Sequence, residues 1–243
     1  MSLLARRRAM MGAKKGFVHG TWEDLFRAID EGTYATEYAV GEVLPLDLGS
    51  TYGNVGAEIV GFNVDTISDS TDKAPVTFVT KYLLKAKYKW NPTKSGTTEG
   101  TGTIGGWRKS QIRTNIHALK SIIPSIVRSR IVSVQKYSRI YDTTETAINN
   151  DLTDDELWIP SSRELGLVSG SSRETLGVVS YTGLNTNEKR IKQTPGDAAE
   201  TYFTRSAYDT TSVWGCATTG KTNSTLAANS SKSFRTSIGF CVG

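Results

Sequence analysis

The strongest structural signal in the sequence is the stretch Gly105-Gly106-Trp107-Arg108-Lys109-Ser110-Gln111-Ile112-Arg113-Thr114-Asn115-Ile116-His117-Ala118-Leu119-Lys120. Ser110 is a suitable N-cap for a helix over residues 111–120, because its hydroxyl can accept a backbone N–H of the first turn. Ile112, Ile116 and Leu119 repeat at the spacing of one helical face. We therefore expect Ile116 to lie in the core and His117 to lie on the opposite, exposed face.

Outward from this helix, the pattern predicts an α+β fold with mixed or antiparallel sheets and two or three short helices. A first helix is expected from Trp22, with Thr21 as its N-cap and Gly32 at its end. A second short helix follows Pro124 and runs to residue 131. Residues 149–155 are interpreted as an acidic turn and 218–233 as a polar, turn-like loop. Segments rich in Val, Ile, Phe and Tyr predict strands over 39–48, 57–63, 75–84, 132–137, 156–159, 201–206, 212–217 and 237–242.

The positive charge of the chain is concentrated at its N-terminus. Residues 1–16 hold five basic side chains and no acidic one, whereas the other 227 residues carry 24 basic and 24 acidic side chains. We expect residues 1–16 to form a basic N-terminal tail, followed by one domain over 17–243. Two interpretations of the tail are open, a solvated arm or an anchor that becomes ordered on a partner protein. The anchor would use Leu3, Leu4, Arg6, Arg7, Arg8, Met10 and Met11.

Composition argues against several classes of protein. A domain whose net charge is zero outside its tail does not indicate nucleic-acid binding. No run of about 18 apolar residues predicts membrane insertion. The N-terminus lacks the apolar segment of a secretory signal, so we expect synthesis in the cytoplasm. Cys216 and Cys241 can form at most one disulfide, and two reduced thiols are the favoured interpretation.

Residues 215–222 match the phosphate-binding pattern G-x-x-x-x-G-K-[ST]. That pattern functions where a strand leads into the loop and a helix follows it, so that backbone amides and the helix dipole meet the phosphate. The residues after Thr222 are rich in Asn, Ser and Thr and make a poor helix. We therefore interpret the match as accidental and expect no nucleotide cofactor.

Side chains for catalysis or metal binding form no recognisable motif. His19 and His117 have no partners at zinc-ligand spacing, and no sharp-turn G-x-S-x-G supports a serine nucleophile. The acids Asp151, Asp154, Asp155 and Glu156 lack the spacing of a calcium loop, so a solvated turn is favoured over a metal site. We expect no metal, no cofactor and no enzymatic activity.

Several short segments, in order along the chain, resemble those of one domain family. It is an uncharacterised family of bacteria and their phages, many members of which lie in phage structural regions. The resemblance implies a fold similar to C-type lectins and to sulfatase-modifying-factor proteins. The matching segments include Thr21-Trp22-Glu23-Asp24, Gly61-Phe62-Asn63-Val64-Asp65, Lys73-Ala74-Pro75-Val76-Thr77-Phe78, Gly105-Gly106-Trp107, Leu157-Trp158-Ile159-Pro160-Ser161-Ser162-Arg163-Glu164, Tyr202-Phe203-Thr204-Arg205-Ser206 and Ile238-Gly239-Phe240-Cys241-Val242.

The resemblance also implies an architectural role for these motifs, including an Arg205 that bonds to carbonyls inside the fold. The sequence departs from calcium-dependent lectins, because it lacks their Glu-Pro-Asn and Gln-Pro-Asp triplets and Trp90-Asn91 continues with Pro92. Calcium-mediated sugar binding is therefore not implied. A shared fold does not transfer the cysteine-based activity of formylglycine-generating enzymes either.

Together these observations predict a non-enzymatic structural and binding module of a phage virion or a bacterial surface assembly. It would join protein partners through the tail, form a homo-oligomer and present a C-terminal face to a host receptor or glycan. Two alternatives stay open, an assembly protein without receptor binding and an enzyme of the formylglycine-generating or nucleotide-hydrolysing type. Under the first alternative, the polar loop residues only solvate a long turn. The residues expected on the binding face are Tyr208, Trp214, Asn223, Asn229 and Arg235.

Deleting residues 1–15 tests the anchor interpretation of the tail. The deletion removes the excess charge together with the apolar side chains that can insert into a partner. We expect the truncated protein to keep its domain fold, measured by circular dichroism, but to stop cosedimenting with its assembly. Normal assembly of the truncated protein would show that the tail is a solvated arm.

Overall fold

A computed structural model describes residues 20–93, 96–167, 180–227 and 233–243. Among the α-helices of these residues, only α2 and α6 have seven residues or more. The helices are α2 (Trp22–Asp30), α3 (Tyr34–Glu37), α4 (Gly49–Tyr52), α5 (Gly106–Lys109), α6 (Gln111–Ala118), α7 (Ser125–Arg128) and α8 (Asn187–Arg190). The strands are β1 (Val43–Leu44), β2 (Ala57–Phe62), β3 (Val76–Thr80), β4 (Ile131–Val132), β5 (Val134–Tyr141), β6 (Ala147–Asp155), β7 (Tyr202–Ala207), β8 (Ser212–Cys216), β9 (Thr222–Ala227) and β10 (Gly239–Val242).

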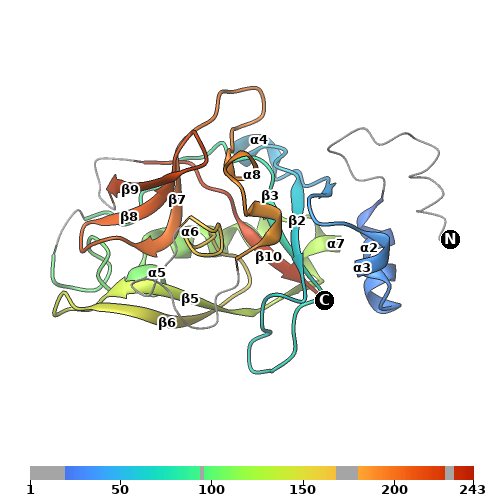
Figure 1. Ribbon diagram of the computed structural model, residues 1–243, viewed down its shortest axis with the longest axis horizontal. Helices are drawn as coiled ribbons and strands as arrows, with labels where there is room; N and C mark the ends of the chain where they lie inside the picture. Colours follow the sequence, from blue (N-terminus) through green and yellow to red (C-terminus); the bar gives the residue numbers. More distant parts are fainter. Residues whose placement is uncertain (1–19, 94–95, 168–179, 228–232) are drawn as a thin grey trace.

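These strands form three antiparallel sheets, so the expected α+β class is confirmed. The first has the order β1-β2-β3-β10-β4, the second is the β5-β6 ribbon, and the third has the order β7-β8-β9. Figure 1 shows the third sheet at one end of the molecule and α2 with α3 at the other, with the first sheet between them. In the same view the β5-β6 ribbon runs along one side of the molecule, from the third sheet to the first.

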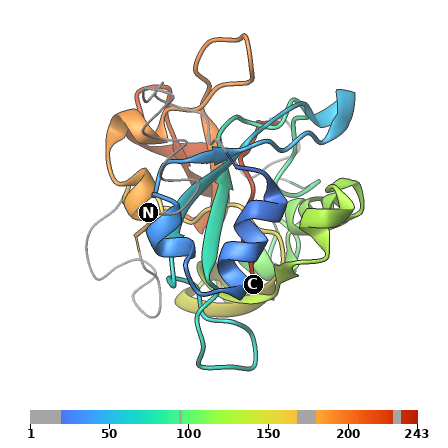
Figure 2. The ribbon, with the colours of Figure 1, turned by 90° about the vertical axis from the view of Figure 1, so that its right-hand side faces the viewer.

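The first helix begins where the sequence predicts it. Thr21 and Asp24 exchange hydrogen bonds between side chain and backbone, which is a capping box, and the left-handed Gly32 (φ 68°) follows the helix. On its inner face Trp22 lies 5.2 Å from Phe78 of β3, ring centre to ring centre. In Figure 2 this helix lies over one face of the first sheet. The aromatic contact therefore joins the start of the described chain to the middle of the sheet.

Strand β10 lies inside the first sheet, between β3 and β4. Phe240 pairs with Phe78 of β3, and Cys241 pairs with Val132 of β4 on the other side. The rings of Phe78 and Phe240 stack with centres 5.2 Å apart. The last strand of the chain thus fills the gap between elements that lie more than a hundred residues earlier.

Helix α6 confirms the predicted apolar face and corrects the expectation for His117. The Ser110 hydroxyl caps the helix by accepting from Arg113 N–H, and Ile116 is fully buried. His117 is only half exposed, because its Nε2 lies 2.8 Å from Asp155 Oδ1 of β6. The expectation that His117 lies on an exposed face is therefore right only in part: 35% of its side chain is exposed, but Asp155 holds it.

Other expectations about the elements were partly wrong. The strand expected over 39–48 is reduced to β1, because Pro45 has no N–H for a ladder. At 156–159 only a single bridge forms, between Trp158 and Gly239. The expected acidic turn is strand β6, and part of the expected polar loop is strand β9. The strands expected at 57–63, 75–84, 132–137, 201–206, 212–217 and 237–242 are confirmed, with shifted ends.

Replacing Ile116 by Asp tests the packing of α6. Ile116 is fully buried, so Ile116→Asp places a carboxylate without a charge partner in the core, and we expect a loss of at least about 4 kcal/mol of unfolding free energy. The control is Thr114→Asp, which adds the same carboxylate on the exposed side of the same helix and should change stability by less than about 1 kcal/mol. Urea denaturation measures both, and equal losses would contradict the assignment.

Candidate functional site

Tyr208 and Trp214 lie together at the end of the third sheet. Tyr208 follows β7, and its N–H donates to Ser212 O (2.9 Å) across the turn to β8, where Asp209 Oδ1 accepts from Thr211 N–H. The two rings meet edge to face with centres 4.7 Å apart. Trp214 is 5% exposed and Tyr208 is 37% exposed. Of this pair, Tyr208 is therefore the side chain that a partner can reach.

Arg235 lies elsewhere. It forms a bridge with Tyr202 at the start of β7, which places it about 20 Å from Tyr208 along the strand, at about 3.3 Å per residue. Its guanidinium forms an ion pair with Glu200 and donates through Nε to Lys85 O. Arg235 therefore secures the chain beside β7 and does not extend the Tyr208 surface.

Asn223 and Asn229 are the other two residues expected on the binding face. Asn223 is part of β9, where its backbone pairs with Gly215 of β8. Asn229 lies outside the described residues. The structure therefore brings Tyr208 and Trp214 into contact, and the binding role of all five residues stays a prediction.

The segment that matches a phosphate-binding loop forms a β-hairpin. Strand β8 leads into the turn, and β9 begins at Thr222, where a phosphate-binding loop would continue as a helix. Gly220 has a φ of 73°, and a Cβ on it would lie 1.9 Å from the Asn187 carbonyl oxygen. The glycine is required by this turn and its close neighbour, and the loop continues as a strand where a phosphate-binding loop needs a helix.

The largest fully buried charged side chain among the described residues is Arg205 on β7. It forms a bidentate ion pair with Glu164, with N–O distances of 2.5 and 2.7 Å. It also donates to the carbonyl oxygens of Ile159 (2.9 Å) and Tyr137 (3.1 Å). Arg205 is 0% exposed. The expectation that Arg205 bonds to carbonyls inside the fold is confirmed, and these bonds join β7 to β5 and to the 157–165 segment.

Lys136 of β5 extends this cluster into the first sheet. Its ammonium group binds Asp65, Glu164 (3.2 Å) and the Tyr181 hydroxyl (2.8 Å), and lies 3.7 Å from the centre of the Trp158 ring. Burial alone would raise the pKa of Glu164, but the charges of Arg205 and Lys136 outweigh it and hold that pKa well below its ordinary value. The cluster therefore consists of buried ions that are paired with one another.

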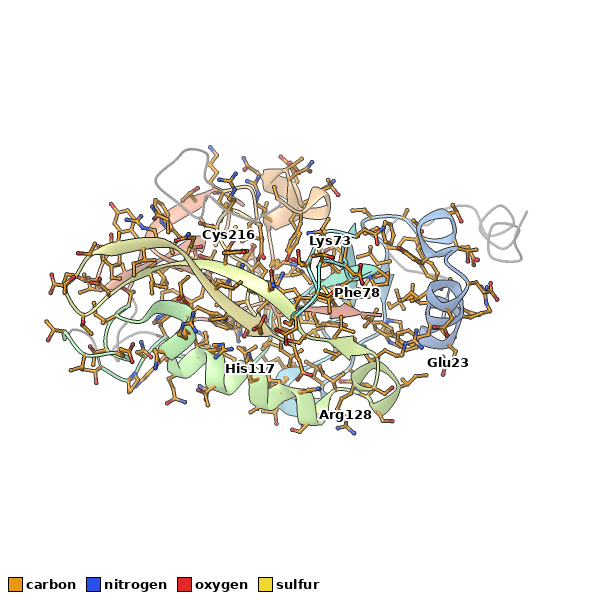
Figure 3. All side chains as sticks on the ribbon, turned by 90° about the horizontal axis from the view of Figure 1, so that it is seen from below. Glu23, Lys73, Phe78, His117, Arg128 and Cys216 are labelled. Atoms are coloured by element: carbon orange, nitrogen blue, oxygen red, sulfur yellow. The ribbon has the colours of Figure 1, made fainter. Side chains whose placement is uncertain are left out.

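A second polar cluster lies between α6 and the β5-β6 ribbon, where Figure 3 labels His117. Its centre is the buried carboxylate of Asp155 at the end of β6. Oδ1 accepts from Arg113 Nε and His117 Nε2, both at 2.8 Å. Oδ2 accepts from the indole N–H of Trp107 (2.9 Å) and from the Thr153 hydroxyl (2.6 Å). Four donors thus fix this carboxylate.

A cavity of about 410 Å³ opens beside the Asp155 cluster and is lined by Arg113, His117, Lys120, Ser133 and Glu156 among others. Since an ionised carboxylate only accepts, His117 donates through Nε2, and its Nδ1 remains an acceptor while the ring is neutral. Lys120 is paired with Glu156 (2.5 Å), and the Ser133 hydroxyl lies 2.9 Å from that of Ser68. The arrangement therefore orients the His117 ring, while the Ser133 hydroxyl bonds to Ser68.

Asp155 titrates far from its ordinary range. Burial raises its pKa, but the hydrogen bond from His117, the charge of Arg113 and the bonds from Thr153 and Trp107 lower it to about 2. The ionised form is therefore the one that holds α6 against β6.

Both cysteines are free and buried, which confirms the interpretation as unpaired thiols. Burial raises the pKa of Cys216, and it raises that of Cys241 well above the ordinary value. Neither is therefore a ready thiolate. Among the described residues, no group of three His, Cys, Asp or Glu side chains is arranged to hold a metal ion. No helix in that same part of the chain is long and apolar enough to cross a membrane.

These features define an α+β protein of antiparallel sheets joined by buried ion pairs. A family model described as a domain of unknown function, DUF6273, matches residues 76–238, and the chain belongs to this family. The match runs from the start of β3 to the residue before β10 and includes Lys136, Glu164 and Arg205. A comparison with curated proteins found no match, and neither did a comparison with solved structures.

Sequence reasoning missed the Asp155 cluster because its members are far apart in the chain. One signal was available: Trp107, Arg113 and His117 all lie within or just before one predicted helix, and an acidic segment follows about 40 residues later. Interpreting that segment as a turn hid the alternation that buries Thr153 and Asp155 on one side of β6.

The Asp155 cluster predicts a pH-dependent contribution to stability. Because the folded pKa is about 2 and the ordinary value is 3.8, the contribution of about 2 kcal/mol is present above about pH 4 and is lost as the pH falls toward 2. The difference in unfolding free energy between the natural protein and Asp155→Asn should therefore shrink between pH 6 and pH 3. Asp197→Asn, at an exposed carboxylate, should show little difference at any of these pH values. Urea titrations measure both, and a difference that does not vary with pH would contradict the assignment.

Proposed function

We propose that this chain is a non-enzymatic structural and binding module with a C-type-lectin-like fold. It belongs to a phage virion or to a bacterial surface assembly, which it joins through its N-terminal tail as a homo-oligomer. The turn between β7 and β8, which carries Tyr208, faces a host receptor or glycan. The observation that carries this proposal is the cluster of Arg205, Glu164 and Lys136. In this cluster, charged residues of the family motifs bond to one another inside the protein.

Such a cluster suits a platform more than a reaction centre. Its charges neutralise one another out of contact with water, so they fix the positions of three sheets and leave the connecting loops to vary. Tyr208 is an exposed aromatic side chain on one of those connections, supported from below by Trp214. Large aromatic side chains held on a rigid support are common contact residues of binding surfaces.

The enzyme alternatives receive less support from the geometry. A formylglycine-generating site depends on reactive cysteines, whereas Cys216 and Cys241 are buried with raised pKa values. A nucleotide hydrolase needs a helix after its phosphate-binding loop, whereas residues 222–227 form a strand. Neither alternative explains the exposure of Tyr208.

Electron microscopy with an antibody against the folded protein tests the assembly role. Particles and cell envelopes of the source organism should carry the label. Labelling of the cytosol alone would contradict the proposal.

The Tyr208→Ser variant separates display from mere assembly. We expect it to join the assembly normally but to lower attachment of the assembly to host cells by about tenfold, because an exposed aromatic contact of an interface is often worth more than about 1 kcal/mol. Ile191→Ser is the matched control, since Ile191 is 39% exposed and lies outside the β7-β8 turn. Normal attachment with Tyr208→Ser would favour the alternative of an assembly protein without receptor binding.

A further inference from the structure

The segment Lys87-Tyr88-Lys89-Trp90 alternates between exposed basic and buried aromatic side chains. Tyr88 is 8% exposed and Trp90 is 0% exposed, while Lys87 and Lys89 face solvent. Tyr88 N–H donates to Phe234 O (2.8 Å), and Phe234 N–H donates back to Tyr88 O (3.0 Å). Side chains two residues apart on extended backbone project on the same side, about 7 Å from one another. The two ammonium groups are therefore carried side by side on a fixed segment.

These lysines have no acidic partner among the described residues. Lys85, two residues before Lys87, is also exposed and forms no ion pair there. By contrast, four lysines of the described residues form ion pairs: Lys81, Lys109, Lys120 and Lys136. In a domain whose charges balance, this row is a local excess of positive charge that is free to attract an anion.

A cavity of about 310 Å³ lies beside Lys87 and Lys89 and is also lined by Tyr88, Pro92, Gln111, Asn115 and Ser233. No acidic side chain lines it. Gln111 Nε2 donates to Asn115 Oδ1 at 3.2 Å, so Gln111 Oε1 and Asn115 Nδ2 remain as one acceptor and one donor. Such amides and a serine hydroxyl match the hydroxyl groups of a sugar, and the two ammonium groups match carboxylates.

We propose that this cavity binds an acidic polysaccharide, in which carboxylates of the chain lie at Lys87 and Lys89 and hydroxyl groups bond to Gln111, Asn115 and Ser233. The site is separate from the Tyr208 surface and does not depend on the proposed assembly role. Under this proposal the protein has a binding surface for a polyanionic ligand in addition to the Tyr208 surface.

Single-stranded nucleic acid also carries regularly spaced negative charges, but the geometry favours the polysaccharide. Proteins that bind single strands present aromatic faces on which successive bases stack. Here Trp90 is fully buried, and Tyr88, which lines the cavity, is only 8% exposed, so the cavity has no open aromatic face on which a base could stack. A sugar chain needs no such face.

Calorimetric titration of the full-length chain with hexagalacturonate, an oligomer of a carboxylated sugar, tests the proposal. We expect saturable binding that weakens as salt is added, because exposed charges are screened. The double variant Lys87→Gln/Lys89→Gln should weaken binding by at least about tenfold, since it removes both charges. Gln111→Ala should weaken binding without reducing its salt dependence.

The matched control is Lys189→Gln/Lys221→Gln, which removes two exposed lysines from other parts of the surface and gives the same net charge. It should leave the affinity unchanged, and every variant keeps the same basic tail. Absence of binding to hexagalacturonate, an equal loss with the control pair, or equally strong binding of hexathymidylate would each overturn the proposal. Because the titration involves no particle or cell, these outcomes are independent of the assembly role.

Discussion

The three sheets depend on one buried ion-pair cluster. Arg205 comes from β7 and Lys136 from β5, and both bind Glu164, which belongs to neither strand. Asp65, which follows β2, brings the first sheet to the same ammonium group. Removing one partner of a buried pair typically costs about 3–5 kcal/mol, because the remaining charge is left in a medium that solvates it poorly. The same constraint gives Lys136, Glu164 and Arg205 an architectural role.

Local signals predicted the elements whose stabilisation is itself local. The N-caps Thr21 and Ser110, and the apolar repeat through Ile112 and Ile116, depend on residues three or four positions apart, and both helices were found where these signals placed them. The strands rich in Val, Ile and Phe were found for a related reason, since their side chains must be buried whichever neighbour they have.

The elements that were missed are polar strands, which are held extended by pairing with the preceding strand of a hairpin. Strand β6 contains Asn149, Asn150 and Asp151, which favour turns in isolation, but pairing with β5 and the donors around Asp155 hold it extended. Strand β9 pairs with β8 in the same way. The candidate sites follow this division. Tyr208 and Trp214 were suspected from their neighbourhood in sequence, whereas the cavity beside Lys87 and Lys89 needs α6 as its second wall, which no local pattern reveals.

The position of β10 between β3 and β4 has a consequence for the nascent chain during translation. Strand β3 is synthesised about 160 residues before β10, which at about 5–20 residues per second is an interval of roughly 10–30 s. During that time the edge of β3 that β10 later covers is unpaired, and an open strand edge invites pairing with other chains. The first sheet therefore closes only once β10 has been synthesised, and until then the nascent chain is open to pairing errors at β3.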